Sequence, residues 1–218
     1  MQRMKYPRIG HIQGSNPSSD DIMFKSTIYN VKWFVTEKMD GSQICFTLDD
    51  NGQIHAFNRN TELLLGHSDK QFSILQIWIN NHYEDLFQLL QTHILYGEWL
   101  FHTHTVYYDT LPDWFLAFGL KDKQTGLFLP PIKTWKDIQQ TSICHVPVFY
   151  EKKQFQSFED MMSIIQKSTY GPNKMEGFVL HHLSGQLRCK YVTKQFKDSV
   201  DNSRHWRTCT RTQNKLNV

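Results

Sequence analysis

The chain has 218 residues, of which 39% are hydrophobic and 14% aromatic, enough to bury the core of one compact domain. Charged residues make up 21% with both signs well mixed, which excludes wholesale disorder. The formal net charge of only +3 excludes a strong basic field over the whole molecule.

The first half of the chain begins with a polar loop over residues 14–21 and then alternates in a strand-like way. Strands are predicted over 31–36, 43–48 and 53–58, with a hairpin turn at 49–52 between the last two. Lys38 is therefore expected on the loop between the first two strands, near the base of the hairpin.

Helical and strand-like patterns alternate through the rest of the chain. Apolar spacing predicts helices over 71–91, 134–140 and 158–166. Further strands are expected over 94–100, 114–120, 176–183 and 186–192. This mixture, joined mainly by antiparallel hairpins, indicates an α+β domain with central antiparallel sheets flanked by helices.

The cysteines and the N-terminus bear on location. The chain has no run of eighteen apolar residues, and its first residues lack the apolar core of a signal peptide. The cysteines, which lie far apart with no paired spacing, are Cys45, Cys144, Cys189 and Cys209. We therefore expect reduced thiols in a cytoplasmic protein.

The most informative residues are Lys38, Asp40 and Gly41. A lysine amine has a pKa of about 10.4 and must lose its proton before it can attack phosphorus. Burial and nearby positive charge favour the neutral amine, and Arg188, Lys190 or a bound divalent cation could supply that charge. Asp40 could hold a metal-bound water or a ribose, and the glycine allows close backbone approach. Alone, this spacing is also typical of a surface turn.

Three further residues lie inside apolar strand-like runs. Glu98 and Glu176 each adjoin a glycine there, and a buried carboxylate is costly unless it is paired or bound to a metal. Phe118 lies in another such run, where it either belongs to the core or stacks on a base. These residues indicate a site more strongly as a set than singly.

The end of the chain is basic. From Arg188 onward there are eight lysines and arginines, opposed only by Asp198 and Asp201 and interleaved with aromatic residues. Such a segment suits a phosphate backbone and stacked bases, although a solvated C-terminal helix is an equally good interpretation. We divide the chain into a catalytic domain over 1–200 and a short basic segment over 201–218.

These residues, taken in order, resemble the motifs of the covalent nucleotidyltransferases, the superfamily of polynucleotide ligases and RNA capping enzymes. The closest likeness is to the ATP-dependent RNA ligases, and it spans about residues 5–200. The matching stretches, which correspond to motifs I, Ia, III, IIIa, IV and V, are residues 38–41, 57–59, 96–100, 115–118, 176–180 and 188–190. The resemblance implies an α+β nucleotidyltransferase domain of the ATP-grasp-like ligase type.

The resemblance also implies roles in holding the nucleoside of ATP. Glu37 would contact the adenine, which Phe118 and Val179 would sandwich. Glu98 would bind the ribose, and Arg59 the ribose or a phosphate.

For the phosphates, the resemblance implies that Lys38 attacks ATP and carries the AMP. Asp40 and Glu176 would hold Mg²⁺ or Mn²⁺, which suit oxygen ligands. Arg188 and Lys190 would hold the α-phosphate. The expected substrate is RNA with 5′-phosphate and 3′-hydroxyl ends, in RNA repair, with an end-healing kinase or phosphatase as a further partner.

The sequence departs from the family pattern in three places. Arg188 stands where relatives often have lysine, Gly119 stands where many carry an acid, and only about 28 residues follow Lys190. We therefore expect a stand-alone domain without the oligonucleotide-binding (OB) barrel. The alternatives are a DNA ligase, a GTP-using capping enzyme, or an RNA-end-binding module with an inactive nucleotide pocket.

Overall fold

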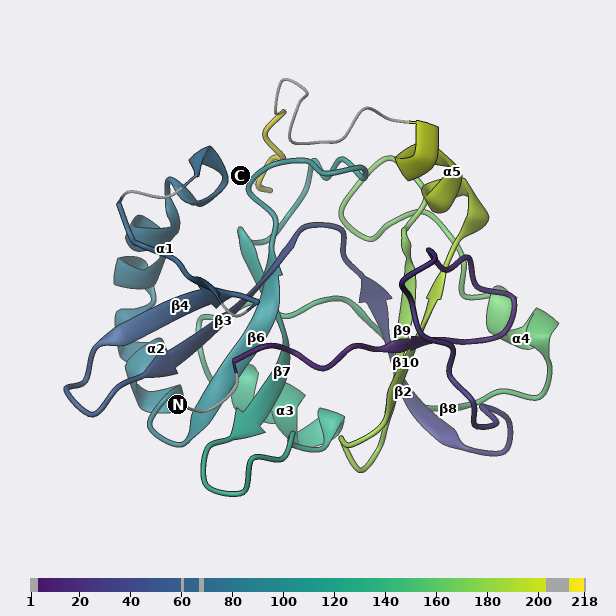
Figure 1. Cartoon of the computed structure of the whole chain (residues 1–218), viewed down its shortest axis with the longest axis horizontal. Coiled ribbons are helices and arrows are strands. Elements are labelled where there is room, and N and C mark those ends of the chain that lie inside the picture. The colour runs from purple at the N-terminus through teal and green to yellow at the C-terminus, as the bar shows by residue number, and fades with distance from the viewer. Residues whose placement is uncertain (1–3, 60, 67–68, 203–211, 218) are drawn as a thin grey trace.

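The computed structural model describes residues 4–59, 61–66, 69–202 and 212–217. In this part of the chain, two five-stranded sheets lie side by side with helices on their outer sides (Figure 1). The helices are η1 (Lys70–Phe72), α1 (Leu75–Asn81), α2 (Tyr83–Leu89), α3 (Pro131–Ile138), α4 (Phe158–Met162) and α5 (Lys194–Asn202). None of these is long and apolar enough to cross a membrane.

The first sheet has the order β1-β10-β9-β2-β8, and only the β1–β10 pair is parallel. Its strands are β1 (Gly10–His11), β2 (Lys32–Lys38), β8 (Val148–Gln154), β9 (Gly177–His182) and β10 (Arg188–Val192). The second sheet has the order β5-β4-β3-β6-β7 and is antiparallel throughout. Its strands are β3 (Ser42–Leu48), β4 (Ile54–Asn58), β5 (Thr61–Glu62), β6 (His93–Trp99) and β7 (Phe115–Asp122).

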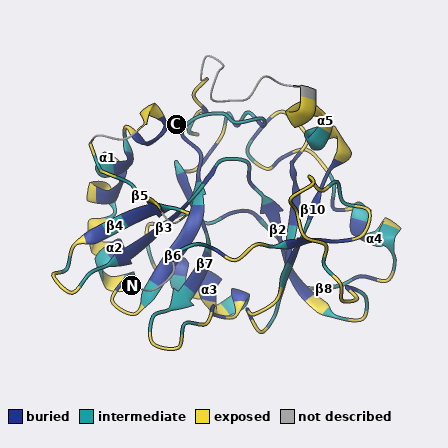
Figure 2. Ribbon diagram, viewed as in Figure 1, coloured by how far each residue is buried: buried dark blue, intermediate teal, exposed yellow. Residues whose placement is uncertain are grey.

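The strands supply nearly half of the buried residues, and most exposed residues lie on the outer helix faces and loops (Figure 2). Strand alternation explains this arrangement, because successive side chains point to opposite faces. On β2, Trp33 and Val35 pack with α4 under the first sheet, whereas Phe34 packs with Leu116 and Trp135 in the cluster between the sheets. Under the second sheet, α1 and α2 cover a separate cluster.

The predicted α+β class with antiparallel sheets is confirmed. Several boundaries differ from the predictions. The one or two helices expected over 71–91 are present as α1 and α2, which meet at His82, and the short η1 precedes them. The helix expected over 158–166 ends at Met162. Lys38 is the last residue of β2 and does not lie on the following loop.

The N-terminal segment joins the two sheets. It runs in front of the space between them before it reaches β1 (Figure 1). Tyr6 packs with Cys45, Tyr96 and Phe128 on the second sheet, and Gly10 then pairs with Cys189 on the first. We call residues 4–9 the N-terminal strap.

Candidate active site

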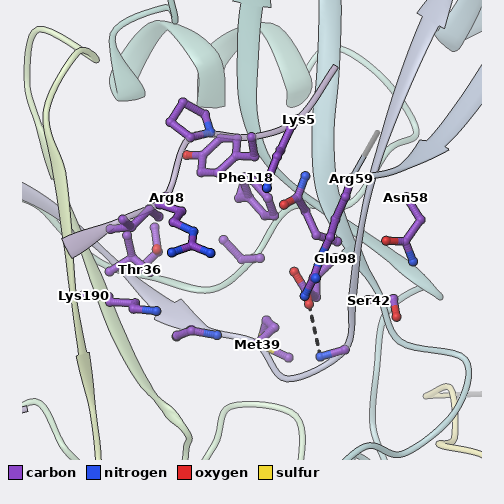
Figure 3. Close-up of a pocket in the computed structure, with 18 of the residues that line it drawn as sticks. Lys5, Arg8, Thr36, Met39, Ser42, Asn58, Arg59, Glu98, Phe118 and Lys190 are labelled. Carbon is purple, nitrogen blue, oxygen red and sulfur yellow. Dashed lines mark hydrogen bonds between the residues drawn. The ribbon is translucent and has the colours of Figure 1, made fainter. Parts of the chain in front are cut away.

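A cavity of about 990 Å³ lies between the two sheets, and the N-terminal strap forms part of its wall (Figure 3). Predicted site residues from both sheets line it: Glu37, Lys38, Arg59, Glu98, Phe118, Val179 and Lys190. The other three predicted residues, Asp40, Glu176 and Arg188, are not part of this lining. The fold therefore brings together residues that lie up to about 150 positions apart in the sequence.

Lys38 reaches the cavity from the end of β2. Its Nζ lies 2.8 Å from Oε1 and 2.8 Å from Oε2 of Glu176, which precedes β9. The two residues meet because Lys38 pairs with Gly177 across the β2–β9 ladder. A side chain at position 177 would meet the Tyr191 carbonyl oxygen at 1.9 Å, so the glycine of this motif permits the close packing of β9 and β10.

Negative charge surrounds the Lys38 amine in the ligand-free protein. Burial lowers the pKa of Lys38, but Glu176, Glu98 and Asp40 together outweigh burial and raise it above the ordinary value. Burial raises the pKa of Glu176 to about 7 and that of Glu98 to about 8, despite the opposing effect of Lys38. This differs from the expectation of a neutral amine, because the nearest charges are carboxylates rather than cations.

Glu98 lies on β6 and faces the cavity (Figure 3). Its Oε1 accepts a hydrogen bond of 3.2 Å from the Gly41 amide, so the acid also holds the backbone that follows Lys38. A Cβ at position 41 would lie 2.5 Å from the Trp99 carbonyl oxygen. Gly41 is therefore needed where β3 begins beside β6.

Arg59 follows β4 and lines the cavity beside Asn58 (Figure 3). Its φ of 57° lies in the left-handed region, which residues other than glycine rarely adopt. Such strain is common at ligand sites, where the surrounding structure fixes an otherwise unfavourable backbone.

Phe118 and Val179 lie on opposite sides of the cavity, since one is on β7 of the second sheet and the other on β9 of the first. The Tyr6 ring packs edge-on against Phe118, with centroids 5.0 Å apart. An aromatic face and a branched apolar side chain on facing sheets can hold a planar base between them.

Lys190 on β10 extends into the cavity (Figure 3). Its Nζ lies 3.4 Å from Oδ1 of Asp21, which comes from the loop before β2. Burial, followed by the nearby charge of Lys38, lowers the pKa of Lys190. It remains suited to binding an anion that enters between it and Lys38.

Asp40 has a different place from the one expected for a metal ligand. One of its oxygens, Oδ2, accepts hydrogen bonds from the amides of Thr105 and Val106 at 2.7 and 2.8 Å. Its own amide donates to the Tyr108 hydroxyl at 2.8 Å. Since it does not line the cavity, Asp40 fixes the loop beside Lys38 in this structure.

Glu37 borders the cavity, but its carboxylate is held by a distant loop. Oε1 accepts a hydrogen bond from the Ser168 hydroxyl and Oε2 one of 3.0 Å from the Thr169 amide. Strand alternation directs neighbouring side chains to opposite faces, which explains why the carboxylate of Glu37 and the amine of Lys38 point in different directions.

Arg188 lies on the far side of the N-terminal strap from Lys38. Its guanidinium carbon is 4.0 Å from the Phe128 ring centroid and 5.3 Å from that of Tyr6. Cation–π contacts of this kind occupy the side chain that was expected to hold the α-phosphate. Arg188 therefore anchors the strap in this structure.

The sequence motifs missed two cations of the strap. Lys5 and Arg8 both point into the cavity (Figure 3), and Arg8 Nη1 donates to the Asp20 carbonyl oxygen at 2.9 Å. Both residues lie well before residue 38, where the first of the six motifs begins, so the motif pattern gave no signal for them.

A divalent cation fits this cavity only as part of a complex with phosphate. The described residues contain no cluster of three or more histidine, cysteine, aspartate or glutamate side chains that could hold a metal alone. Burial raises the pKa values of Glu98 and Glu176, and the neighbouring carboxylates raise them further, a repulsion that a cation would relieve. Mg²⁺ commonly takes one or two carboxylates and completes its shell with phosphate oxygens and water.

The basic end of the chain is partly neutralised. On α5, Lys194 pairs with Asp198 at 2.8 Å, and Lys197 pairs with Asp201. Lys215 is exposed, while Arg204, Arg207 and Arg211 lie outside the described residues. Residues 212–217 pack on the domain over 1–200, so this part of the segment is integrated into the fold.

Comparison with known proteins places this geometry in a family. The sequence model described as RNA ligase matches residues 31–196, which is most of the chain and includes all six motifs. A search of curated protein sequences finds no match.

Solved structures of Naegleria gruberi RNA ligase have the same fold. The form with PPi has a TM-score of 0.67 at 21% identity and covers 90% of this chain and 62% of that one. A mutant with ATP and Mn has a TM-score of 0.65 at 20% identity, and the match covers 92% of this chain and 64% of that one. A mutant with AMP and Mn has a TM-score of 0.62 at 20% identity, with the same coverage of both chains. The chain thus spans less than two thirds of the length of these structures.

Proposed function

Because the chain belongs to the RNA ligase family, we propose that it is an ATP-dependent RNA ligase that joins 5′-phosphate and 3′-hydroxyl ends through a lysyl-AMP intermediate on Lys38. One observation carries the proposal: the Lys38 amine enters a cavity between two sheets, next to Glu176, and Phe118 and Val179 line the same cavity from different sheets. RNA is the proposed partner on the strength of the family.

In the first step, Lys38 Nζ attacks the α-phosphorus of ATP. A nitrogen–phosphorus bond forms, the bond to the β-phosphate oxygen breaks, and pyrophosphate leaves as the amine loses its proton. Lys190, Arg59 and the strap cations line the cavity where negative charge would develop on phosphate oxygens. A divalent cation, Mg²⁺ or Mn²⁺, would offset the charge of the triphosphate when held by Glu176, Glu98 and phosphate oxygens.

The Lys38–Glu176 pair must open before this attack, because an ion-paired ammonium has no free electron pair. Whatever neutralises Glu176 lowers the pKa of Lys38, since Glu176 is the largest cause of its elevation. Substrate binding and activation of the nucleophile are thus linked through one carboxylate.

In the second step, a 5′-phosphate oxygen of RNA attacks the lysyl-AMP phosphorus, forming a pyrophosphate bridge and freeing Lys38. In the third, a 3′-hydroxyl attacks the RNA 5′-phosphorus, forming the phosphodiester and releasing AMP. Phe118, Val179 and Glu98 would hold the AMP through all three steps.

The test is transfer of label from α-labelled ATP to the protein, read by denaturing electrophoresis. Wild type and the control Lys32→Ala, an exposed lysine at the start of the same strand, are expected to become labelled. Lys38→Ala is expected to lose all labelling. A labelled Lys38→Ala protein would reject Lys38 as the nucleophile.

Two further experiments, nucleotide competition and a comparison of nicked RNA with nicked DNA, separate this function from the alternatives. Excess unlabelled ATP should suppress labelling while GTP and NAD do not, and nicked RNA should be sealed faster than nicked DNA. Preference for GTP would favour a capping-type enzyme, and sealing of DNA alone would favour a DNA ligase. Folded protein that takes no label from any nucleotide would favour an RNA-end-binding module.

A further inference from the structure

Residues 212–217 form a short segment near the C-terminus (Figure 1), and backbone hydrogen bonds join it to the loop after β6. The Thr103 amide donates to the Thr212 carbonyl at 2.8 Å, and the Leu111 amide to the Lys215 carbonyl at 3.0 Å. The Asn217 amide donates to the Leu111 carbonyl at 2.8 Å. We call residues 212–217 the C-terminal latch and residues 100–111 the latched loop.

Asn214 is the centre of the latch and is 2% exposed. Its Nδ2 donates to the Leu100 carbonyl at 2.7 Å. Its Oδ1 accepts from the Thr103 hydroxyl at 2.8 Å and from the Tyr108 amide at 3.0 Å. An amide is the side chain that donates and accepts in this way, so aspartate at this position would lose the donor and bury a charge.

The latched loop also holds the backbone next to Lys38. The Tyr108 hydroxyl accepts from the Asp40 amide at 2.8 Å, and Oδ2 of Asp40 accepts from two amides of the same loop. Tyr108 is fully buried, and its backbone carbonyl also accepts from the Lys215 amide at 2.9 Å. A continuous series of hydrogen bonds thus connects Asn214, Tyr108 and Asp40, two residues from the nucleophile.

We propose that Asn214 and Tyr108 are positioning residues for Lys38, and that Asn214 is the one residue of the C-terminal latch whose side chain supports the nucleotidyl-transfer site. The inference rests on the proposed function, because it assigns these residues to the lysine adenylylation step. The latch adds to the other contacts of the latched loop, which are hydrogen bonds with Asp40, Tyr170 and Gln71 and the packing of its buried residues in the cluster between the sheets. The residues that position Lys38 thus extend well beyond the last sequence motif.

The kinetic test compares Asn214→Ala with Gln213→Ala, an exposed neighbour on the same segment. Single-turnover labelling at saturating ATP gives both a rate constant and an endpoint stoichiometry. We expect Asn214→Ala to slow the rate constant about 10- to 100-fold with its endpoint preserved, while Gln213→Ala matches wild type. An unchanged rate constant, with or without a lower endpoint, would overturn the proposal, because loss of folded protein lowers only the endpoint.

A double-mutant cycle tests the route. Tyr108→Phe keeps the ring and removes the oxygen that accepts from the Asp40 amide. If Asn214 acts through Tyr108, the double variant should be slowed by much less than the product of the two single effects. Independent, multiplying effects would overturn the proposed route.

Hydrogen exchange separates this inference from the proposed function, because it needs no activity. Asn214→Ala should speed exchange in peptides that cover residues 100–111 and 37–42, whereas Gln213→Ala should not. Faster exchange confined to residues 212–217 would overturn the latch even in a protein that takes up label normally. Conversely, wild type that takes no label would reject the proposed function whatever the exchange shows.

Discussion

Lys38 lies among carboxylates, which explains how a buried lysine can be accommodated in the folded protein. In the free protein, Glu176 satisfies the buried ammonium, as a buried charge requires a partner. The surplus negative charge then makes the same place attractive to a cation, and only together with that cation to a triphosphate. Under the proposed function, the ion pair would hold the amine protonated until a complex of cation and ATP binds.

Glu98 should make the stability of the free protein fall as pH rises. Burial raises its pKa to about 8, above the value of 4.5 for a free side chain. A group whose pKa is higher in the folded state stabilises the fold below its unfolded pKa, and this contribution is lost as pH rises through about 8. Glu98→Gln stays neutral and can still accept from the Gly41 amide. In EDTA, the melting temperature of Glu98→Gln relative to that of wild type should therefore increase between pH 6 and pH 9.

We expect a gain of at least about 1 kcal/mol in relative stability, or about 2–4 °C in melting temperature. Thermal unfolding by circular dichroism at several pH values measures it. Glu151→Gln removes an exposed carboxylate and is the control, with a curve parallel to wild type. Parallel curves for Glu98→Gln as well would mean that Glu98 ionises freely in the folded protein.

Sequence patterns predicted which residues the fold brings to one cavity more reliably than where their side chains point. The cavity contains Lys38, Glu98 and Lys190 as expected, because the motifs fall on strands that face it. Asp40 and Glu37 turn elsewhere because their partners, in loops 65 and 131 or more positions away, are invisible to local spacing. Orientation at these positions depends on tertiary hydrogen bonds.

Among the elements, the N-terminal strap connects the two sheets most directly. Tyr6 packs on Tyr96, Phe118 and Phe128 of the second sheet, and Arg188 of the first lies over its ring. The strap therefore fixes the spacing of the cavity walls and supports the side of Phe118. Its contribution comes from the ring, because the Tyr6 hydroxyl has no hydrogen-bond partner among the described residues.

Two substitutions of Tyr6 should consequently behave very differently. Tyr6→Ala removes a nearly buried ring and should cost about 3–5 kcal/mol of unfolding free energy, measured by urea denaturation. It should also raise the KM for ATP, since Phe118 loses its support. Tyr6→Phe should unfold within about 1 kcal/mol of wild type, because no described hydrogen bond is lost. A large loss in Tyr6→Phe would point to a ligand or water on the hydroxyl.

Local patterns predicted the long strands and the hairpin turns, but not the short or polar strands. β8 carries the charged run Glu151 to Lys153 on an exposed sheet edge, where alternation of apolar residues is weak. β1 and β5 have two residues each and exist only through pairing with longer strands. The end of α4 at Met162 likewise depends on packing beneath the first sheet.

At the scale of the whole molecule, the cavity lies between two sheets that the cluster around Phe34 and the N-terminal strap hold together. The order β1-β10-β9-β2-β8 joins strands from both ends of the chain, so no local signal could predict it. The strap crosses from one sheet to the other, and the C-terminal latch steadies the loop beside Lys38. A ligand that bridges the sheets should therefore stabilise the entire fold.

Lys38→Ala offers the cleanest measurement of that stabilisation, because it can bind ATP without reacting. The variant leaves Glu176 buried without its partner, so the apo form should melt below wild type at pH 8.

Mn²⁺ or Mg²⁺ with ATP should raise the melting temperature of Lys38→Ala by about 5–10 °C at 100 times the dissociation constant. The cation alone should have a smaller effect, because Glu98 and Glu176 supply only part of a coordination shell. ATP in EDTA should have little effect on the melting temperature, because without a cation the carboxylates repel the triphosphate. Equal stabilisation by ATP with and without the cation would contradict the shared carboxylate–phosphate site. No shift in any mixture would show that the folded protein does not bind ATP.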